Sequence, residues 1–374
     1  MSVRVLIAGG GVAALEAAIA LHEIAGDRVE VSMYAPREDF IYRPFAVSAP
    51  YGASPAMRYD LAELAERCGA VYHRATIGSV DPEAQRAHTH DGEEIAYDHL
   101  IVACGTRLLA GISGAVTFWG VADDGRVLDV VRELREGSVK RLAFTTPGGG
   151  SWALPLYELA LLAESELSKQ GVKGASLVIV TPEDSPLHIF GRAASERVGE
   201  LVAERGVEVV TGVTPIRFEA GQIAVSPQGT VDADAVLSLP RMEGRRIGGI
   251  PHDPAGFVPV DDYGRVRGAG HVYAAGDVTA FPVKQGGVAT QQADVVAEAI
   301  AAELGCDVAA EPLDPVLRGV LWTGAKPLYL TGHLFGGHGE TSSAGEVPPW
   351  EGGEEDKLVG RYLTPFFAEL TAAA

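Results

Sequence analysis

The stretch from Val3 to Leu21 constrains the fold of this chain most strongly. A strand-like apolar run leads into Gly9-Gly10-Gly11, and a helix-like apolar run follows directly. Gly9 permits a tight turn, Gly11 lets the backbone approach a pyrophosphate, and Ala14 is small enough for the helix to pack closely on the strand. Because the free N–H groups of a helix N-terminus attract anions, this order predicts a dinucleotide site. A structural glycine turn in another kind of α/β protein is the alternative.

The composition disfavours several classes of function. A net charge of −20, from 50 acidic and 30 basic residues, opposes binding to nucleic acid and electrostatic docking on anionic membranes. At 374 residues and 47% hydrophobic content, the chain is long enough for two or three packed domains. No apolar stretch reaches the length of a transmembrane helix, and Met1-Ser2 leads into the first strand without room for a secretory signal. We therefore expect a cytoplasmic protein.

The cysteines and histidines form no metal-binding pattern. Cys68, Cys104 and Cys306 are widely spaced, with no Cys-x-x-Cys pair, so neither a zinc site nor a disulfide framework is expected. His333 and His338 lie in a glycine-rich stretch without an acidic or cysteine partner at metal spacing, which favours loop histidines over ligands. We predict no metal.

The second predicted strand, within residues 27–35, lacks the acid that usually ends it in a nucleotide site. An Asp or Glu is expected about twenty residues after the glycines, where it binds ribose hydroxyls, but the strand ends at Ala35. Glu38 and Asp39 follow in a predicted loop. The next cluster, which contains Arg43 and Pro44, either lines a cofactor or packs the loop. A helix is predicted over residues 56–68, with an apolar face.

Residues 75–82 and 95–106, with a turn at Asp91-Gly92 between them, predict a small β unit that returns to a buried strand. Within it, Tyr97 to Gly105 resembles the Tyr-Asp-x-Leu-Ile-Val-Ala-Thr-Gly motif of the FAD-dependent pyridine nucleotide-disulfide oxidoreductase superfamily, with Cys104 in place of the threonine. Far downstream, His271 to Val278 resembles the second FAD motif of the same superfamily. The resemblance implies that Asp277 contacts the FAD ribityl chain. An aspartate that caps the following turn is the alternative.

A second α/β unit is predicted between these motifs, with strands at 141–146, 177–180 and 207–210 and a helix over 154–168. NADH-using relatives carry Gly-x-Gly-x-x-Gly after its first strand. Here Pro147 follows the strand, Trp152 follows the glycines, and Pro155 opens the helix. The turn offers a pyrophosphate no obvious seat, so NAD(P)H binding in the usual manner is not expected, although Gly148 to Gly150 could coat a phosphate in another way.

The stretch from Pro155 to Glu158 resembles the sulfide:quinone reductase and flavocytochrome c sulfide dehydrogenase branch of the superfamily. In that branch a redox cysteine precedes the Tyr-Glu pair, and here Trp152 stands at about its place. The partner cysteine, expected near Leu321 to Gly324, is also missing. Because sulfide oxidation through cysteines needs two sulfurs within bonding reach, that chemistry is not expected.

Two charged residues are candidates for catalysis. By the resemblance, Glu158 faces the flavin, and a half-buried carboxyl there could deliver the proton that accompanies electron transfer to a quinone. The alternative is a helix-start glutamate favoured by the helix dipole. Lys284 precedes a predicted helix that begins at Gly286 and resembles the helix aimed at the flavin pyrimidine, where positive charge would stabilise the reduced flavin. A surface lysine is the alternative.

The last predicted helix, over residues 356–370, carries an apolar stripe that contains Leu363, Phe366 and Phe367. In quinone-reducing relatives a C-terminal amphipathic region enters the membrane, so a peripheral contact at the inner membrane face is one interpretation. Packing over the flavin domain, or against another subunit in a homodimer, is the other.

Together these patterns predict an α/β protein with two Rossmann-like domains. The FAD-binding domain is discontinuous, at 1–110 and 241–310; a degenerate NAD(P)-like domain spans 111–240, and a C-terminal region spans 311–374. The leading hypothesis is an FAD-dependent oxidoreductase that passes two electrons from a small-molecule donor to a quinone or small acceptor; an NAD(P)H-dependent reductase and a non-catalytic FAD-binding or sensing protein are alternatives. The predicted cofactor-binding residues are Gly9, Gly11, Ala13, Ala14, Arg43, Pro44, Ile77, Ala103, Gly105, Gly276, Asp277, Lys284 and Gly286.

Overall fold

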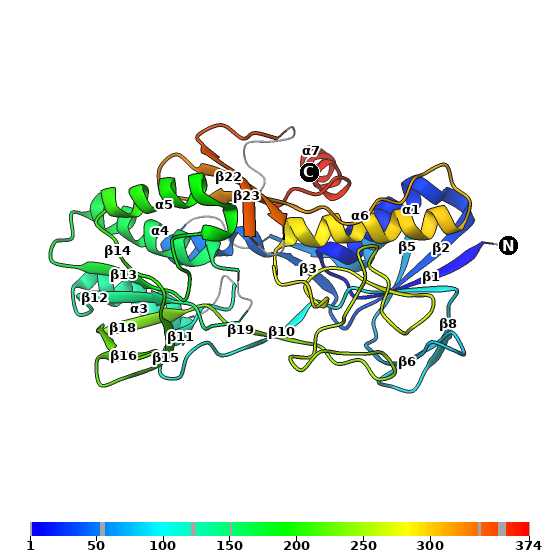
Figure 1. The fold of residues 1–374 in the computed structure, drawn as a ribbon, viewed down its shortest axis with the longest axis horizontal. Helices are drawn as coiled ribbons and strands as arrows, with labels where there is room; N and C mark the ends of the chain where they lie inside the picture. The colour runs from blue at the N-terminus through cyan, green and yellow to red at the C-terminus, as the bar shows by residue number, and fades with distance from the viewer. Residues whose placement is uncertain are drawn as a thin grey trace.

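The computed structural model describes residues 2–52, 57–120, 125–149, 152–335, 338–350 and 357–373. Its helices are α1 (Val12–Ala25), α2 (Leu61–Arg67), α3 (Gly125–Glu136), α4 (Leu154–Gln170), α5 (Arg192–Glu204), α6 (Gly286–Glu303) and α7 (Leu363–Ala373), with 3₁₀ turns η1 (Gly26–Arg28), η2 (Arg43–Tyr51) and η3 (His188–Phe190). Figure 1 shows two α/β units side by side, with the C-terminal strands above the space between them.

The first sheet is parallel throughout and has the order β20-β9-β1-β2-β5. Its strands are β1 (Val3–Ala8), β2 (Val29–Tyr34), β5 (Ala70–His73), β9 (His99–Val102) and β20 (Val272–Ala274). Alternate residues of β1 face opposite sides: Val5 and Ile7 pack under α1 and α6, whereas Leu6 packs toward the small β6-β7-β8 sheet. Because β20 pairs with β9, the sheet joins two parts of the chain that are far apart in sequence.

The second sheet repeats this plan with the order β11-β18-β12-β13-β14, again all parallel. Its strands are β11 (Val116–Thr117), β12 (Arg141–Thr145), β13 (Ser176–Val180), β14 (Glu208–Val210) and β18 (Ala235–Ser238). Leu142 and Phe144 pack in a core with α3, α4 and α5, and Ala143 packs on the opposite face beside Ile223 of a small antiparallel sheet. A parallel sheet with an apolar layer on each face is the arrangement expected of βαβ units.

The remaining strands form small antiparallel sheets. They are β3 (Asp39–Tyr42) with β4 (Met57–Asp60), β6 (Ile77–Asp81) with β7 (Arg86–Thr89) and β8 (Glu94–Ala96), β10 (Thr106–Leu109) with β19 (Arg241–Gly244), β15 (Thr214–Glu219) with β16 (Gln222–Ser226) and β17 (Thr230–Asp232), and β21 (Val316–Leu321) with β22 (Leu328–Phe335) and β23 (His338–Gly345). The β10-β19 pair brings together the two places where the chain crosses between the units (Figure 1). The domain boundaries given above stay predictions.

Several predicted elements were wrong in their boundaries. Residues 57–60 belong to β4 rather than to a helix, because they pair with β3; helix α2 begins at Leu61 and is capped by the Asp60 side chain, which accepts the Glu63 N–H. Asp39 starts β3 and does not lie in a loop. His333 lies in β22, because that strand pairs with β21, and β23 begins at His338. The final helix begins at Leu363, and residues 351–356 lie outside the described part of the chain.

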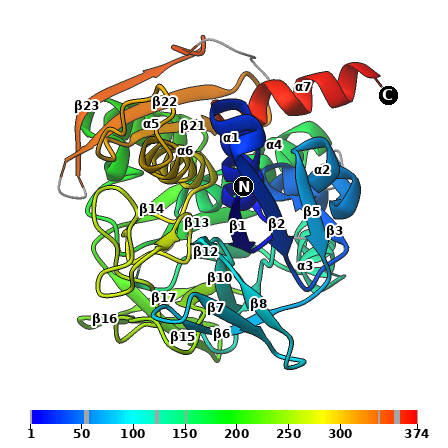
Figure 2. The same ribbon diagram turned by 90° about the vertical axis from the view of Figure 1, so that its right-hand side faces the viewer.

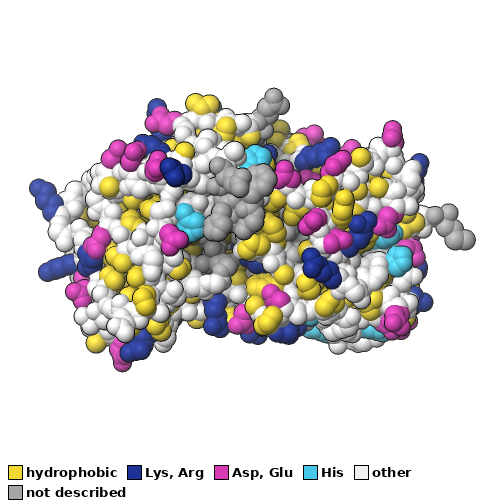
Figure 3. All heavy atoms as spheres, viewed as in Figure 1, with side chains coloured by type: hydrophobic (Ala, Val, Ile, Leu, Met, Phe, Trp, Pro, Cys, Tyr) yellow, Lys and Arg dark blue, Asp and Glu magenta, His cyan; other side chains and the backbone are white. Residues whose placement is uncertain are grey.

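Helix α7 packs over the first unit, beside α1 (Figure 2). Leu363 and Phe367 are buried in the same core as α1 and α6, and the Phe367 ring lies 5.7 Å from Phe40 and 5.0 Å from Tyr59. The packing interpretation therefore accounts for the buried part of the apolar stripe. No helix within the described ranges is long and apolar enough to cross a membrane. On the face shown in Figure 3, acidic and basic side chains are interspersed.

Candidate functional site

A cavity of about 590 Å³ lies at the carboxyl ends of the first sheet's strands and extends to the start of α4. Ligands of doubly wound folds bind at this edge, and the volume is typical of a small-molecule site. Of the predicted cofactor-binding residues, all but Ala14 line this cavity, and so does Glu158. Ala14 does not line the cavity; it is fully buried within α1 and packs in the helix–sheet core, which fits its predicted packing role, and its assignment as a cofactor-binding residue stays a prediction.

The glycine turn leaves room for a ligand on one side only. Gly9 has φ +148°, and a Cβ there would lie 2.1 Å from the Ala103 carbonyl oxygen, so the strands could not approach this closely with a larger residue. A Cβ on Gly11 would meet no protein atom within 4 Å, although Gly11 lines the cavity. No side chain in the described ranges caps α1. Its first N–H groups are therefore available to an anion, as a pyrophosphate requires.

Asp277 presents its carboxylate to the cavity. It follows Gly276, whose φ of +80° turns the chain at the end of β20. Burial raises the pKa of Asp277, and the neighbouring charges of Lys284 and Arg43 oppose this shift. Within the described part of the chain the carboxylate makes no hydrogen bond, so the alternative in which it caps the following turn finds no support. A carboxylate with spare acceptors in a cavity fits the hydroxyl groups of a ribityl chain.

Lys284 is a buried lysine, not a surface one. Its side chain is 5% exposed, Nζ donates a 2.5 Å hydrogen bond to the Thr279 carbonyl oxygen, and the ammonium lies 3.9 Å from the Phe257 ring centroid. Burial lowers the pKa of Lys284 to about 8, and the charge of Asp277 opposes that shift. Helix α6 begins at Gly286, directly after the capping residue Gln285. The cavity wall therefore combines a positive helix end with a cation, as predicted.

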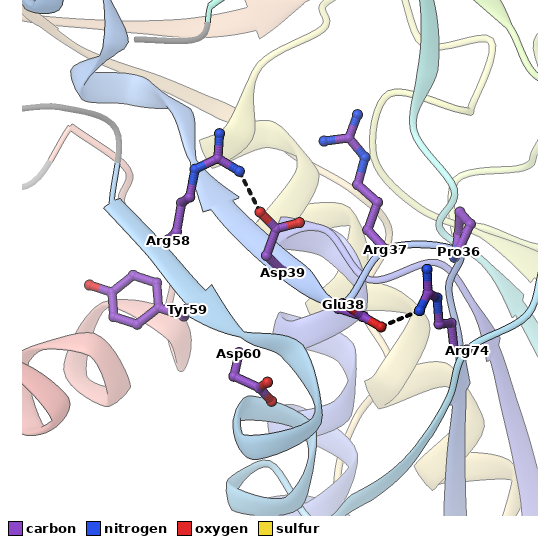
Figure 4. A pocket seen from close by; sticks show the side chains of 8 residues that line it. All are labelled: Pro36, Arg37, Glu38, Asp39, Arg58, Tyr59, Asp60 and Arg74. Carbon is purple, nitrogen blue, oxygen red and sulfur yellow. Dashed lines mark hydrogen bonds and ion pairs between the residues drawn. The ribbon is translucent and has the colours of Figure 1, made fainter. Parts of the chain in front are cut away.

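The loop after Ala35 provides no unpaired acid. Glu38 pairs with Arg74, and Asp39 pairs with Arg58 at 2.5 Å, in a hollow beside the cavity (Figure 4). In this view the Arg37 side chain points away from both ion pairs. Arg37 also lines the main cavity, together with Arg245 and Arg246, which the sequence analysis did not select. The cavity wall thus includes arginine side chains, whereas Glu38 and Asp39 of this segment are each paired with another arginine.

Glu158 is fully buried and faces the cavity from α4. Its Oε1 accepts hydrogen bonds from Lys357 Nζ at 2.5 Å and from the Trp322 N–H at 2.9 Å. Its Oε2 is buried and has no hydrogen-bond partner in the described ranges. These bonds reach other segments and not the N-terminus of α4, so the alternative of a helix-start glutamate held by its own helix does not describe the site.

Lys357, the partner of Glu158, is a cavity residue that the sequence analysis did not select. It precedes α7, lines the cavity and lies 4.5 Å from the Trp322 ring centroid. Burial raises the pKa of Glu158 and lowers that of Lys357, while each group's attraction for the other opposes its shift. Burial therefore favours the neutral forms of both groups, whereas their mutual attraction favours the charged forms. No local pattern marked Lys357, because its partner lies on a distant helix.

The cavity wall also has an apolar part, to which Val47, Phe118, Trp119, Trp152, Leu154, Leu239, Met242 and Val320 belong. Five of these, Val47, Phe118, Trp152, Leu154 and Leu239, pack in or against the core that contains α4. The Trp152 ring, at the place of the expected redox cysteine, packs 5.5 Å from the Phe190 ring. This region fits a planar apolar molecule with a polar group directed to the free Glu158 oxygen.

Cys104 lines the cavity between Ala103 and Gly105, and burial raises its pKa to about 11. Burial also raises the pKa of Cys68 to about 12. Because the thiolate is the reactive form, both thiols are poor nucleophiles at neutral pH. Cys68, Cys104 and Cys306 are all free.

In the second unit, side chains of the same unit hydrogen-bond to Glu183, which follows β13. Tyr157 Oη donates a 2.8 Å hydrogen bond to Glu183 Oε2, and the Thr181 hydroxyl donates to the same oxygen at 3.0 Å. Burial raises the pKa of Glu183 to about 7. An acid just after the second strand of such a unit could bind the ribose hydroxyls of a nucleotide, but here the carboxylate accepts a hydrogen bond from Tyr157 of α4. Gly150 of the predicted glycine turn lies outside the described ranges.

Comparison with known proteins agrees with this geometry. Residues 3–299 match the pyridine nucleotide-disulphide oxidoreductase family. A sulfide-quinone reductase of Aquifex aeolicus is 24% identical over 269 residues, which cover 66% of this chain and 60% of that protein, so the match spans less than two-thirds of that relative. An NADH dehydrogenase-like protein of Mycobacterium tuberculosis is 26% identical over 297 residues, covering 74% of this chain and 73% of its own length.

The fold has a solved counterpart. The X-ray structure of the sulfide:quinone oxidoreductase from Aquifex aeolicus matches with a TM-score of 0.78 at 20% identity, covering 92% of this chain and 87% of that one. The predicted α/β fold with Rossmann-like domains is thereby confirmed. Since the family match covers most of the chain, the protein belongs to the pyridine nucleotide-disulphide oxidoreductase family and is an FAD-dependent oxidoreductase.

Proposed function

We propose that this flavoenzyme passes two electrons to a quinone or a similar planar acceptor, and that the Glu158–Lys357 pair supplies a proton to that acceptor. The observation that carries the proposal is the buried carboxyl–amine pair on an apolar wall, with Glu158 Oε2 free. FAD, when bound, takes up and releases the electron pair. The names of two relatives, a sulfide-quinone reductase and a mitochondrial sulfide:quinone oxidoreductase, support a quinone as acceptor.

The residues of the cavity have separable tasks in this proposal. The glycine turn after β1 and Asp277 hold the dinucleotide, and Lys284 with the start of α6 compensates negative charge that appears on reduction. The tryptophan and leucine side chains beside Glu158 exclude water and orient a flat acceptor. A quinone that gains two electrons takes up two protons. Glu158 donates one from its neutral form and is reprotonated by Lys357, and the other would accompany the electron pair that the reduced cofactor supplies.

An NAD(P)H-dependent reductase is the second candidate, because one relative is named NADH dehydrogenase-like. The second sheet gives it less support: Pro147 lacks an N–H in the turn, Trp152 lies before α4, and Glu183 is bonded to Tyr157. A cofactor-binding or sensing protein without turnover is the third candidate. A peripheral membrane contact through α7 would use Tyr362 and Phe366, the partly exposed members of its stripe.

Stopped-flow spectroscopy separates the three candidates. Under anaerobic conditions the protein-bound flavin is photoreduced and mixed with decylubiquinone; we expect rapid return of the flavin absorbance. In a second arm the oxidised protein is mixed with NADH, NADPH or sulfide. Fast bleaching by a nicotinamide without reoxidation by quinone would replace the proposal with the second candidate. No reaction in either arm would favour the third.

A further inference from the structure

The C-terminal segment that carries Lys357 is held by a carboxylate from the first helix. Glu16 is fully buried in α1, and its two oxygens accept the N–H groups of Tyr362 at 2.9 Å and Leu363 at 2.8 Å, where α7 begins. A Cβ on Gly360 would lie 2.8 Å from Glu16 Oε2, so the segment comes this close only with glycine there. An anion at the N-terminus of a helix is stabilised by the unpaired N–H groups and the helix dipole.

A second carboxyl group, that of Asp294 on α6, lies beside Glu16, close enough for the two groups to shift each other's pKa. Asp294 Oδ1 is buried and finds no donor in the described part of the chain. Two ionised carboxylates in contact repel each other strongly, so such a pair retains one proton between them. Because Glu16 receives two backbone N–H groups, it keeps the negative charge, and the proton resides on Asp294.

The pair also has other charged and titratable neighbours. The Arg361 cation opposes the raised pKa of Asp294, but Arg361 itself pairs at 2.8 Å with Glu298, one turn beyond Asp294 on α6, whose charge raises that pKa. Cys68, at the end of α2, is a buried thiol close to Glu16. The Tyr362 phenol lies near the same carboxylates, and its pKa is raised mainly by burial. The proton shared with Asp294 is thus what keeps the pair at a single negative charge.

The segment before α7 connects this pair to the cavity. The Thr290 hydroxyl of α6 donates to the Val359 carbonyl oxygen at 3.1 Å, and Leu358 is buried in the core with α1 and α6. Lys357, the next residue toward the N-terminus, pairs with Glu158. Anything that loosens the chain from 358 to 363 therefore also moves the Lys357 ammonium.

We propose that Glu16 and Asp294 form a single-proton clamp that seats the C-terminal segment and so positions Lys357 beside Glu158. Glu16 and Asp294 act through Lys357 and are positioning residues, not catalytic ones. The consequence for turnover rests on the function proposed above, but the clamp itself does not. Loss of the Asp294 proton places a second negative charge beside Glu16. The repulsion weakens the attachment of the C-terminal segment to α1, and the Lys357 ammonium then leaves the cavity.

The pH dependence has a definite sign and range. Burial and the charge of Glu16 raise the pKa of Asp294 to about 9 in the seated state, whereas a released segment returns it toward the ordinary value. Seating is therefore strongest at low pH, weakens as the pH rises toward about 9, and is constant above it. The seated-to-released ratio changes by up to about tenfold per pH unit across this range.

Trypsin cleavage after Lys357 and Arg361 measures seating directly on the flavin-bound protein. We expect the rate of release of the C-terminal peptide, divided by that of a synthetic peptide of the same sequence, to rise steeply from pH 6 to pH 9 and then level off. Asp294→Asn keeps a hydrogen-bond donor but no titrating proton, and it should flatten this profile. Asp307→Asn, at an exposed aspartate beyond α6, should keep the wild-type profile.

The Asp294 variant distinguishes the clamp from a titration of Lys357 or another nearby group. An unchanged slope in Asp294→Asn would assign the pH dependence to such a group and overturn the clamp. A flat profile in the wild type would overturn it as well. Glu16→Gln should release the peptide faster at every pH, because one N–H loses its charged acceptor.

Turnover gives the second readout. If quinone reduction occurs, its decline between pH 6 and pH 9 should be shallower in Asp294→Asn than in the wild type. An identical decline in both would refute the link from the clamp to Lys357. If no quinone is reduced at all, the function proposed above fails, while the proteolysis profile still decides the clamp.

Discussion

The two parallel sheets share a plan but differ in one turn between a strand and the helix after it: the β1–α1 turn in the first sheet and the β12–α4 turn in the second. In the first sheet, β1 ends at Ala8, and three glycines lead into a helix whose N–H groups open on the cavity. In the second sheet, β12 ends at Thr145 and Pro147 follows, so the turn lacks one of the N–H groups that an anion would use. Trp152 and Pro155 then border the cavity at the start of α4.

The difference shows how one fold can serve two purposes in a single chain. The first turn keeps the room and the donors that a pyrophosphate needs. In the second turn Pro147 supplies no N–H, and α4 contributes to the cavity wall: Tyr157 bonds to Glu183 inside the second unit, and the next residue, Glu158, faces the cavity. We infer that the second unit contributes the side of the cavity that contains Glu158 and does not bind a second nucleotide.

The largest expected effect comes from breaking the first turn. Gly11→Val places a branched side chain in the empty space before α1, where the pyrophosphate would lie, so we expect loss of bound FAD. The matched change in the second turn, Gly148→Val, should leave the flavin content per folded protein unchanged. Absorbance of purified protein after removal of free flavin measures both. Retained flavin in Gly11→Val, or lost flavin in Gly148→Val with a folded chain, would refute the comparison.

The second effect concerns two glutamates, Glu158 on α4 and Glu183, which bonds to the neighbouring Tyr157. Glu158→Gln keeps the shape but removes the ionisable group, so acceptor reduction should slow by about 10²–10⁴-fold with FAD still bound. Glu183→Gln, which does not line the cavity, should change turnover little. Equal turnover in both variants would leave Glu158 without a role in the chemistry.

The third effect is on stability and belongs to the second unit. The pKa of Glu183 rises from 4.5 to about 7 on folding, so its contribution is complete below pH 4.5 and is lost as the pH rises to about 7. The loss is at most about 1.4 kcal/mol per pH unit. Thermal unfolding of Glu183→Gln should therefore lack part of the wild-type decline in Tm between pH 5 and pH 7, and parallel Tm curves would contradict this.

How far the sequence predicts this molecule depends on whether a feature is local. The glycine turn before α1, the Gly276–Asp277 turn and the start of α6 follow from neighbouring residues, and all line the cavity. The Lys357–Glu158 pair and the Glu16 bond to Leu363 join residues 199 and 347 positions apart, and no spacing announces them. Similarly, residues 57–60 have a helix-like context, but their pairing with β3 decides their structure.

The smallest expected effect tests whether the cysteine thiols of either unit take part in the reaction. The second turn carries Trp152 at the place of a redox cysteine, and Cys104 lies on the cavity wall as a buried thiol whose pKa is raised. Replacing Cys68 and Cys104 by alanine and Cys306 by serine should leave flavin content and quinone turnover within about twofold of the wild type, since burial disfavours the thiolates of Cys68 and Cys104 and Cys306 does not line the cavity. Single replacements serve as controls for folding. Loss of turnover with full flavin content in the Cys104→Ala variant alone would show that this thiol takes part, and the proton pathway would then have to include it.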